Sequence, residues 1–218
     1  MEIPAWSYSS LTAFETCAKQ YYFTRVSKEV ERQETDATRW GNEVHKALEL
    51  RLTIGQELPA SLRQFEGVLS KLLAHSGEML VEHRMALNAD MTPGEWDNCW
   101  CRGIVDVGVV DAERAVLLDW KTGKRKMELE QLKLFAGFTF AHYPKVRTVS
   151  TGFVWLKEDK VDQKVFTRDD TTEIWSTFIP RVKRLEKAYE NNVWLAKPSG
   201  LCRGWCPVPK RLCEFSSK

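Results

Sequence analysis

Two aspartates and a lysine, on either side of a short polar turn, have the chemistry of a metal-dependent hydrolytic site. Asp106 lies in one apolar run rich in valine and isoleucine, and Asp119 and Lys121 lie in the next apolar run. Residues 111–114 between the runs have the length and polarity of a hairpin turn. The sequence therefore predicts a β-hairpin that brings the three side chains to one place.

The hairpin also predicts where these side chains point. A turn centred on Ala112 and Glu113 places Asp106 opposite Asp119, and Lys121, two residues further on, shares the face of Asp119. Two carboxylates about 5 Å apart repel each other unless a cation lies between them. Oxygen ligands suit Mg²⁺ or Mn²⁺, and a neighbouring lysine can orient or deprotonate a water molecule. The alternative is a solvated hairpin with its charges on an exposed face.

The order of the surrounding elements predicts the fold class. Hydrophobic periodicity and end signals give helices over residues 10–25, 37–54, a segment after 59–61, 128–142 and 169–191, and strands over 79–87, 99–121 (the hairpin), 147–156 and 161–167. This order predicts an α/β fold with a mixed central sheet flanked by helices. We expect one domain over residues 1–218, with a helical part (1–75), a sheet core (76–168) and a C-terminal helix with a cysteine-rich tail (169–218).

Composition and charge exclude several classes of protein. The 218 residues contain no apolar run of about 18 residues, so no transmembrane helix is indicated. The first residues lack the basic and apolar regions of a signal peptide, so we expect a cytoplasmic protein. No Gly-x4-Gly-Lys-Ser/Thr phosphate loop occurs, which argues against a helicase motor. The net charge is only +2, but residues 121–126 and 181–218 are basic, which suits either a phosphate-bearing substrate or a solvated surface.

Six cysteines in a chain without a secretion signal favour metal ligands or core thiols over disulfides. Cys202, Cys206 and Cys213 lie in a segment rich in glycine and proline, which can wrap around a metal. A structural site usually needs four thiolates, and Cys17 on the first predicted helix is the candidate for the fourth. The two cysteines of the hairpin strand are alternatives. Ligand spacing leaves a [4Fe–4S] cluster, Zn²⁺ and an unligated tail open.

The order of these motifs resembles that of the PD-(D/E)XK nuclease superfamily, and within it the RecB-like branch. That branch includes the nuclease domains of RecB and AddB, four-cysteine CRISPR-associated exonucleases and small phage-encoded proteins, which the C-terminal segment resembles most. The similar segments are the N-terminal helix (7–23), a histidine motif (41–49), the next strand (82–87), Gly-Ile-Val-Asp (103–106), Asp-Trp-Lys-Thr-Gly (119–123), a glutamine motif (131–135) and the cysteine tail (202–213). In the glutamine motif, Phe135 stands where tyrosine is common.

The resemblance implies a restriction-endonuclease-like sheet and a role for each matching residue. On its own, His45 at the edge of an apolar stripe is more often a core or surface residue than a ligand. The implied metal ligands are His45, Asp106, Asp119 and the carbonyl of Trp120, with Glu82 binding a second metal or a water of the first. The implied catalytic residues are Asp106, Asp119, Lys121, which activates the water, and Gln131, which holds the substrate or Lys121. Cys17, Cys202, Cys206 and Cys213 would hold a [4Fe–4S] cluster or a structural Zn²⁺ and join the two chain ends.

The implied function is a Mg²⁺- or Mn²⁺-dependent deoxyribonuclease, an exonuclease on single-stranded DNA or DNA ends. Such enzymes act in phage or bacterial recombination, repair or degradation, in the host cytoplasm and with a helicase or recombinase as partner. One alternative is a structure-specific endonuclease, and another is a catalytically idle DNA-binding scaffold, although none of His45, Asp106, Asp119 or Lys121 is missing. A zinc deaminase would need His-x-Glu and Pro-Cys-x-x-Cys, and the sequence has neither.

Overall fold

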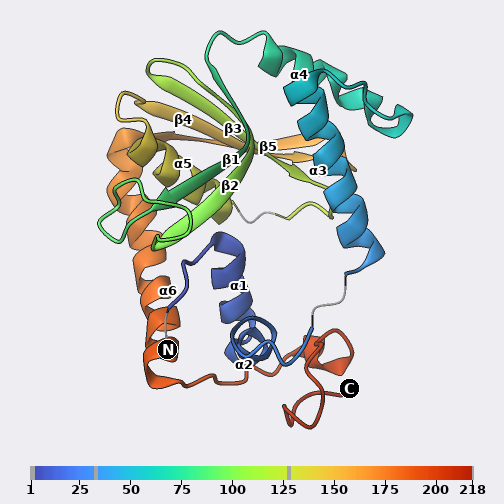
Figure 1. Cartoon of the computed structure of the whole chain (residues 1–218), viewed down its shortest axis with the longest axis vertical. Coiled ribbons are helices and arrows are strands. Elements are labelled where there is room, and N and C mark those ends of the chain that lie inside the picture. The colour runs from blue at the N-terminus through green and yellow to red at the C-terminus, as the bar shows by residue number, and fades with distance from the viewer. Residues whose placement is uncertain (1–2, 32–33, 127–128, 218) are drawn as a thin grey trace. The chain divides into compact units, whose positions relative to one another are not determined.

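The computed structural model of the protein describes residues 3–31, 34–126 and 129–217. The Cα positions divide the chain into two compact units, labelled by their helices and strands in Figure 1. The first unit comprises Met1–Glu34 and Ser176–Lys218, and the second comprises Thr35–Trp175. No helix within the described ranges is long and apolar enough to cross a membrane.

The second unit is built on one five-stranded mixed sheet whose strands follow chain order across the sheet. The strands are β1 (Glu78–Leu87), β2 (Cys101–Val110), β3 (Arg114–Lys121), β4 (Thr148–Trp155) and β5 (Lys160–Thr167). All neighbours are antiparallel except β3 and β4, which are parallel and joined through α5 (Glu130–His142). A parallel pair needs such a crossover because a tight turn cannot connect it. The predicted α/β fold with a mixed sheet is confirmed, while the predicted helix start at residue 128 lies outside the described residues.

Helices flank this sheet, as the sequence predicted (Figure 1). Helix α3 (Asp36–Ile54) begins at the N-cap Thr35 and ends at Gly55, whose φ of 73° suits glycine. It packs with the 3₁₀ turn Ala60–Phe65 and α4 (Glu66–Leu73) on an apolar layer of the sheet. The buried sheet residues of that layer are Val107, Val109, Trp120, Val154 and Leu156. Helix α5 packs elsewhere on the sheet, where its Phe138 closely approaches Gly103 of β2.

The central hairpin has the register that its sequence predicts. Val110 pairs with Ala115 and Val107 with Leu118, and the turn is closed by a hydrogen bond from the Asp111 N–H to the Arg114 carbonyl (2.8 Å). Away from the turn, the pairing between β2 and β3 ends at Val107 and Leu118, although both strands continue. The two next positions in this register are Asp106 and Asp119. Both aspartates therefore lie where the two strands separate.

Glu82 in the middle of β1 has a left-handed backbone conformation, with φ of 46°. Val81 pairs with Val107 and His83 with Val105, so Glu82 stands opposite Asp106. A non-glycine residue in this region costs roughly 1–2 kcal/mol. Such strain inside a strand is typical of a position that function requires.

This left-handed residue coincides with an inversion of the face alternation in the two strands. Val107 and Val109 pack with α3 and α4, whereas Gly103, an even number of residues away, faces Phe138 of α5. Regular alternation would put all three on one face. The inversion lies between Gly103 and Val107, and Glu82 is opposite that segment. Beyond the inversion, the residues on either side of Gly103 point away from α5.

We predict that Glu82→Gly is more stable than Glu82→Ala. Glycine adopts a φ of 46° without the steric cost, about 1 kcal/mol, that a Cβ incurs there. Urea unfolding of the two variants measures the difference. At Lys164, an exposed position of β5 with ordinary strand pairing, the glycine variant should instead be the less stable of the two. If the alanine variant were the more stable of the two at Glu82 as well, the backbone of Glu82 would not be strained.

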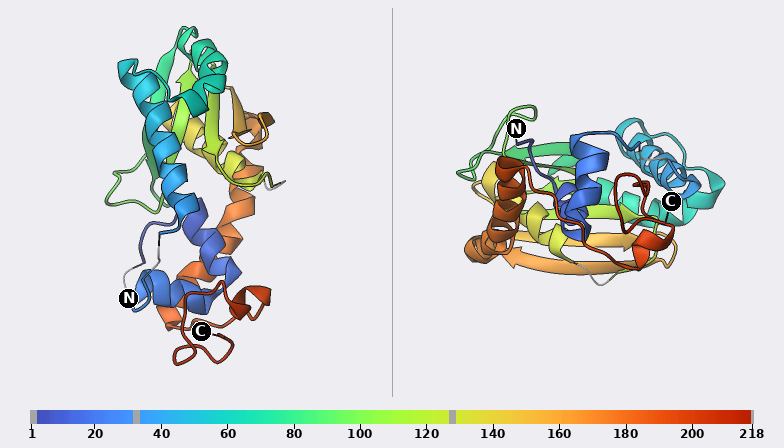
Figure 2. Two further views of the ribbon diagram at one scale, coloured as in Figure 1. Left: turned by 90° about the vertical axis from the view of Figure 1, so that its right-hand side faces the viewer. Right: turned by 90° about the horizontal axis from the view of Figure 1, so that it is seen from below.

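The first unit contains α1 (Tyr8–Thr16), α2 (Ala18–Tyr21), a π-helical turn (Tyr22–Val26), most of α6 (Thr171–Asn191) and the C-terminal tail. The predicted continuous N-terminal helix is wrong in one respect, because Cys17 has extended dihedrals (φ −164°, ψ 111°) and divides it. In the tail, Trp194 packs its ring against Phe14, Tyr21, Tyr22 and Tyr189. Within this unit the tail runs past α1 and α2, as Figure 2 shows.

Candidate active site

Three side chains of the second unit, all of types that ligate metals in proteins, converge at the point where β2 and β3 separate. His45 comes from α3, Glu82 from β1 and Asp106 from β2, and one ligand atom of each lies within 4.8 Å of the others. His45 Nδ1 is 3.5 Å from Asp106 Oδ2 and 4.0 Å from Glu82 Oε1. Helix α3 aims the imidazole at the sheet because Val44 and Leu48, on either side of it, are buried in the layer beneath.

The backbone of Trp120 on β3 completes this group. Its N–H donates to Asp106 Oδ2 (2.7 Å), and its carbonyl oxygen lies 3.0 Å from His45 Nε2. Burial lowers the pKa of His45, but Asp106, Asp119 and the Trp120 carbonyl outweigh burial, so the pKa is raised overall. The imidazole is therefore held next to a carbonyl and two carboxylates, and this arrangement favours its protonated, cationic form.

A second group of side chains is linked in a closed ring beside the first. Gln131 on α5 donates through Nε2 to Asp119 Oδ1 (2.9 Å) and accepts through Oε1 from Lys121 Nζ (3.0 Å). Lys121 Nζ also lies 2.6 Å from Asp119 Oδ2 and 4.7 Å from the centre of the Phe153 ring. These contacts fix the ammonium group in one position, and Gln131 links it to Asp119.

Burial and repulsion from a neighbouring carboxylate make Asp119 and Glu82 difficult to ionise. Burial first, and then the charge of Asp106, raises the pKa of Asp119 to about 7, against the opposing effect of Lys121. Burial and Asp106 likewise raise the pKa of Glu82. Since one carboxylate makes the ionisation of the next more difficult, the group as a whole favours either protons or a metal ion.

The donor set fits a divalent cation. It offers an imidazole nitrogen, the carboxylates of Glu82 and Asp106, and a backbone carbonyl oxygen. Asp119 Oδ2 is buried and has no hydrogen-bond donor aligned with it, although Lys121 is close. A buried carboxylate oxygen without a donor is costly unless a cation approaches it.

The structure brings together most of the residues predicted from the sequence. His45, Glu82, Asp106 and the Trp120 carbonyl form one group, and Asp119, Lys121 and Gln131 form the other. Asp119 is not within 4.8 Å of all members of the first group. The sequence reasoning missed Phe153, which pairs with Asp119 across the parallel strands. The sequence predicted the strand over 147–156 that contains Phe153. Only the register of that strand with β3 shows that Phe153 lies next to Asp119.

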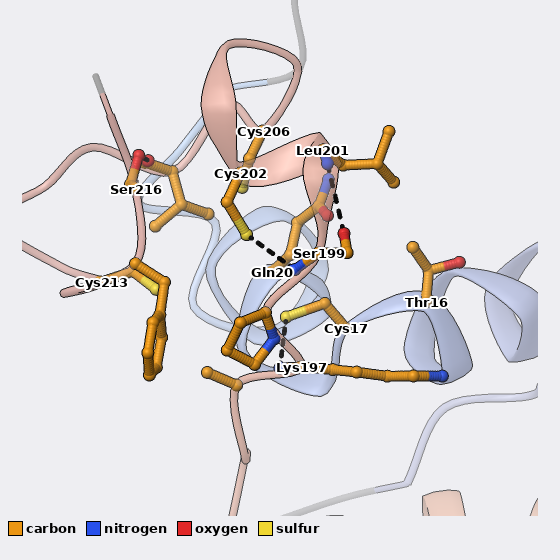
Figure 3. A pocket seen from close by; sticks show the side chains of 14 residues that line it. Thr16, Cys17, Gln20, Lys197, Ser199, Leu201, Cys202, Cys206, Cys213 and Ser216 are labelled. Atoms are coloured by element: carbon orange, nitrogen blue, oxygen red, sulfur yellow. Dashed lines mark hydrogen bonds between the residues drawn. The ribbon is translucent and has the colours of Figure 1, made fainter.

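Four cysteines of the first unit line one pocket (Figure 3). They are Cys17, Cys202, Cys206 and Cys213, and all are free thiols. The N–H of Lys197 donates to Cys17 Sγ (3.4 Å), and the N–H of Ser199 donates to Cys202 Sγ (3.5 Å). Among the described residues, no three cysteine sulfurs lie within 4.8 Å of one another, so the predicted site is not a compact ligand set.

The remaining two cysteines belong to the second unit. Cys101 is fully buried, and burial raises the pKa of its thiol well above the usual value. Cys99 donates to the Trp96 carbonyl (3.4 Å). Neither lines the pocket of the other four, so their use as alternative ligands has no support in this geometry.

Residues 5–98 match the family model of the PD-(D/E)XK nuclease superfamily. This match covers less than half of the chain and shows a similarity to the superfamily over these residues. The matched segment contains His45 and Glu82 but ends before Asp106, Asp119 and Lys121.

Two solved structures are similar to this chain at low identity. The "Putative exonuclease" from Eubacterium rectale has 14% identity and a TM-score of 0.47, with 91% of each chain covered. The protein SSO0001 has 12% identity and a TM-score of 0.39, with 80% of this chain and 77% of that chain covered. A search of the curated proteins finds no match.

We predict that Asp119→Asn removes a pH dependence from the stability of the metal-free protein. The pKa of Asp119 is about 7 in the folded state and about 3.9 in an unfolded chain, so the folded state binds this proton more tightly. The resulting stabilisation is complete below pH about 4 and is lost as the pH rises through about 7. In EDTA, the Tm of the wild type should fall relative to that of Asp119→Asn between pH about 5 and about 8. Asp111→Asn, at an exposed turn residue, is the control, and parallel curves for wild type and Asp119→Asn would contradict the prediction.

Proposed function

We propose that this chain is a metal-dependent DNA nuclease that hydrolyses phosphodiester bonds with Mg²⁺ or Mn²⁺. The observation that carries the proposal is the fixed position of Lys121 beside the proposed metal ligands. Asp119 and Gln131 hold its ammonium group. His45, Glu82 and Asp106 converge at the same place, where β2 and β3 separate. A structural role alone would not require a half-buried lysine, three carboxylates and an imidazole at one strand end.

His45, Asp106, Asp119 and the Trp120 carbonyl are the proposed metal ligands, with Glu82 as ligand to a second metal or to a water. A divalent cation at this place supplies positive charge that polarises the scissile phosphate and acidifies a water molecule. The Trp120 N–H holds Asp106 in position, and Gln131 holds Asp119. The chain therefore fixes its carboxylates before substrate binds, which avoids reorganisation during the reaction.

Lys121 is the proposed group that orients the attacking water. An ammonium group has three N–H donors, and Gln131 accepts one of them. Asp119 holds the lysine close to the metal ligands. A remaining donor is available to a water oxygen or to a phosphate oxygen, which is the geometry that general acid–base and electrostatic catalysis need.

The proposed substrate is DNA, and the proposed action is exonucleolytic, on single strands or ends. The order of motifs resembles the RecB-like branch, and exposed Lys124 and Lys126 follow the catalytic strand, where phosphates would approach. By the same resemblance we place the activity in recombination, repair or degradation of DNA in the cytoplasm of bacteria or of phage-infected bacteria. A helicase or recombinase is the partner that this assignment implies.

Lys121→Ala and Asp119→Ala should each reduce DNA cleavage with Mn²⁺ by at least about 100-fold, because one removes the group that orients water and the other a metal ligand. The wild type should be inactive in EDTA. Lys160→Ala, at an exposed position of β5, is the matched control and should retain activity. Circular dichroism of each variant checks that the fold is intact, and full activity in both Lys121→Ala and Asp119→Ala would refute the mechanism.

The mode of cleavage is tested with labelled substrates. Single-stranded, double-stranded and circular DNA carrying 5′ or 3′ labels are digested with Mn²⁺. An exonuclease leaves the circular DNA intact and releases short products from one end, whereas cleavage of the circle would identify an endonuclease.

We further propose that Cys17, Cys202, Cys206 and Cys213 hold a [4Fe–4S] cluster. The four thiols line one pocket, and backbone N–H groups donate to two of the sulfurs, as expected for thiolate ligands. Four thiolates on one Zn²⁺ would lie roughly 3.8 Å apart, because each bond is about 2.3 Å long. Among the described residues no three of these sulfurs lie within 4.8 Å of one another, which fits the larger cluster better, although both groups fit the thiol chemistry.

The protein purified anaerobically should be brown and should contain about four iron atoms per chain, with one thiolate ligating each iron. Cys206→Ser should lose the colour and the iron and should lower the Tm, because the ends of the chain are no longer joined. Cys101→Ser changes a buried thiol outside the pocket and should retain the iron. A colourless protein with one zinc per chain would refute the cluster and retain the four-cysteine site.

A further inference from the structure

Two arginines on neighbouring strands converge on one tryptophan in the second unit. The guanidinium carbon of Arg84 on β1 lies 5.0 Å from the ring centre of Trp96, and that of Arg102 on β2 lies 5.1 Å from it. Arg102 also donates to the Trp96 carbonyl (3.2 Å). One such cation–π pair is common in proteins, but two on one ring place like charges close together.

The loop that carries Trp96 is fastened to β1. The Gly94 N–H donates to the Ala86 carbonyl (2.9 Å), and the Trp100 N–H donates to the Leu87 carbonyl (2.8 Å). Asn88 closes the loop by donating to the Pro93 carbonyl (3.1 Å). The indole is therefore held in place by the backbone, and the two arginines are positioned against a fixed ring.

Within the described part of the chain, neither arginine has a carboxylate within 4 Å, although Glu95 and Asp97 flank Trp96 in sequence. Arg84 is exposed, and Arg102 and Trp96 are half-buried. Two adjacent positive charges without an acidic partner repel each other, and an anion bound between them would relieve the repulsion.

This pair lies on the same strands as the proposed metal ligands. Arg102 and Ile104 lie on either side of Gly103, which faces α5, so both point away from α5. Arg84 pairs with Ile104 across the ladder, and Glu82 and Asp106 are two residues further along their strands. At about 3.3 Å per residue, Arg102 is roughly 13 Å from Asp106 along β2, with the exposed side chain of Ile104 between them.

We infer that Arg84 and Arg102 bind phosphates of single-stranded DNA whose scissile bond lies at the proposed metal site. Trp96 is the positioning residue that holds both guanidinium groups toward the strand. Guanidinium groups bind phosphate through paired N–H donors, and basic grooves with aromatic side chains are typical of single-strand binding. The inference rests on the proposed function, because it takes the DNA to be the substrate of the neighbouring site.

The test is the binding of a fluorescent oligothymidylate to the full chain in EDTA, where hydrolysis does not occur. Arg84→Gln and Arg102→Gln should each lower the affinity about tenfold, as loss of a charged hydrogen bond does. Each should also reduce the slope of log K against log salt concentration by about 0.7, because one fewer counterion is released from a single strand. Trp96→Leu should lower the affinity but retain most of the slope, since both charges remain.

Arg147→Gln is the matched control. Arg147 is an exposed arginine just before β4, at the end of that strand away from the proposed site, and it pairs only loosely with Glu113 (3.5 Å). Its substitution should change neither affinity nor slope. Unchanged affinity and slope in both Arg84→Gln and Arg102→Gln, with intact circular dichroism spectra, would overturn the inference.

A small substrate separates this inference from the proposed function. The nitrophenyl ester of thymidine monophosphate is too short to reach Arg102, so with Mn²⁺ both arginine variants should hydrolyse it like the wild type. DNA binding that depends on Arg84 and Arg102, without any hydrolysis by the wild type, would refute the nuclease and keep the inferred phosphate-binding site. Hydrolysis by the wild type with unchanged DNA binding in both arginine variants would refute the inferred phosphate-binding site and keep the nuclease.

Discussion

The repulsion among Glu82, Asp106 and Asp119 is the constraint on which the rest of the second unit depends. Burial raises the pKa of Asp119 to about 7, and the neighbouring carboxylate adds to the effect. The compensating groups come from three elements: His45 from α3, the Trp120 N–H and Lys121 from β3, and Gln131 from α5. The packing of α3 and α5 on the sheet is therefore also what holds the carboxylates together.

The same constraint explains the unusual backbone of β1. A regular strand alternates its faces without interruption. The left-handed conformation of Glu82 coincides with an inversion of that alternation opposite Asp106. The strain is local, and its cost of roughly 1–2 kcal/mol is small against the total free energy of folding of a domain of this size. A carboxylate reaches His45 and Asp106 as a result.

The sequence predicted the parts of this arrangement that depend on short-range chemistry. The turn residues at Ala112 and Glu113 determined the register of the hairpin, because a two-residue loop allows only one pairing. The strand and helix order followed from periodicity. Three features depend on tertiary packing and could not be read from the chain: the break of the first helix at Cys17, the φ of Glu82, and the contact of Phe153 with Lys121. Each needs a register or a backbone angle that no local pattern specifies.

The two units differ in whether their residues are continuous in the sequence. Thr35–Trp175 is one continuous stretch, whereas the other unit combines Met1–Glu34 with Ser176–Lys218. During synthesis the continuous stretch is complete while the C-terminal segment is still missing, so the carboxylate site can form first. The ion pair of Glu15 with Arg181 and the hydrogen bond of Tyr21 with Tyr189 must wait for the last part of the chain. The cysteine pocket likewise combines Cys17 with three cysteines of the C-terminal segment, so it needs both parts of this unit.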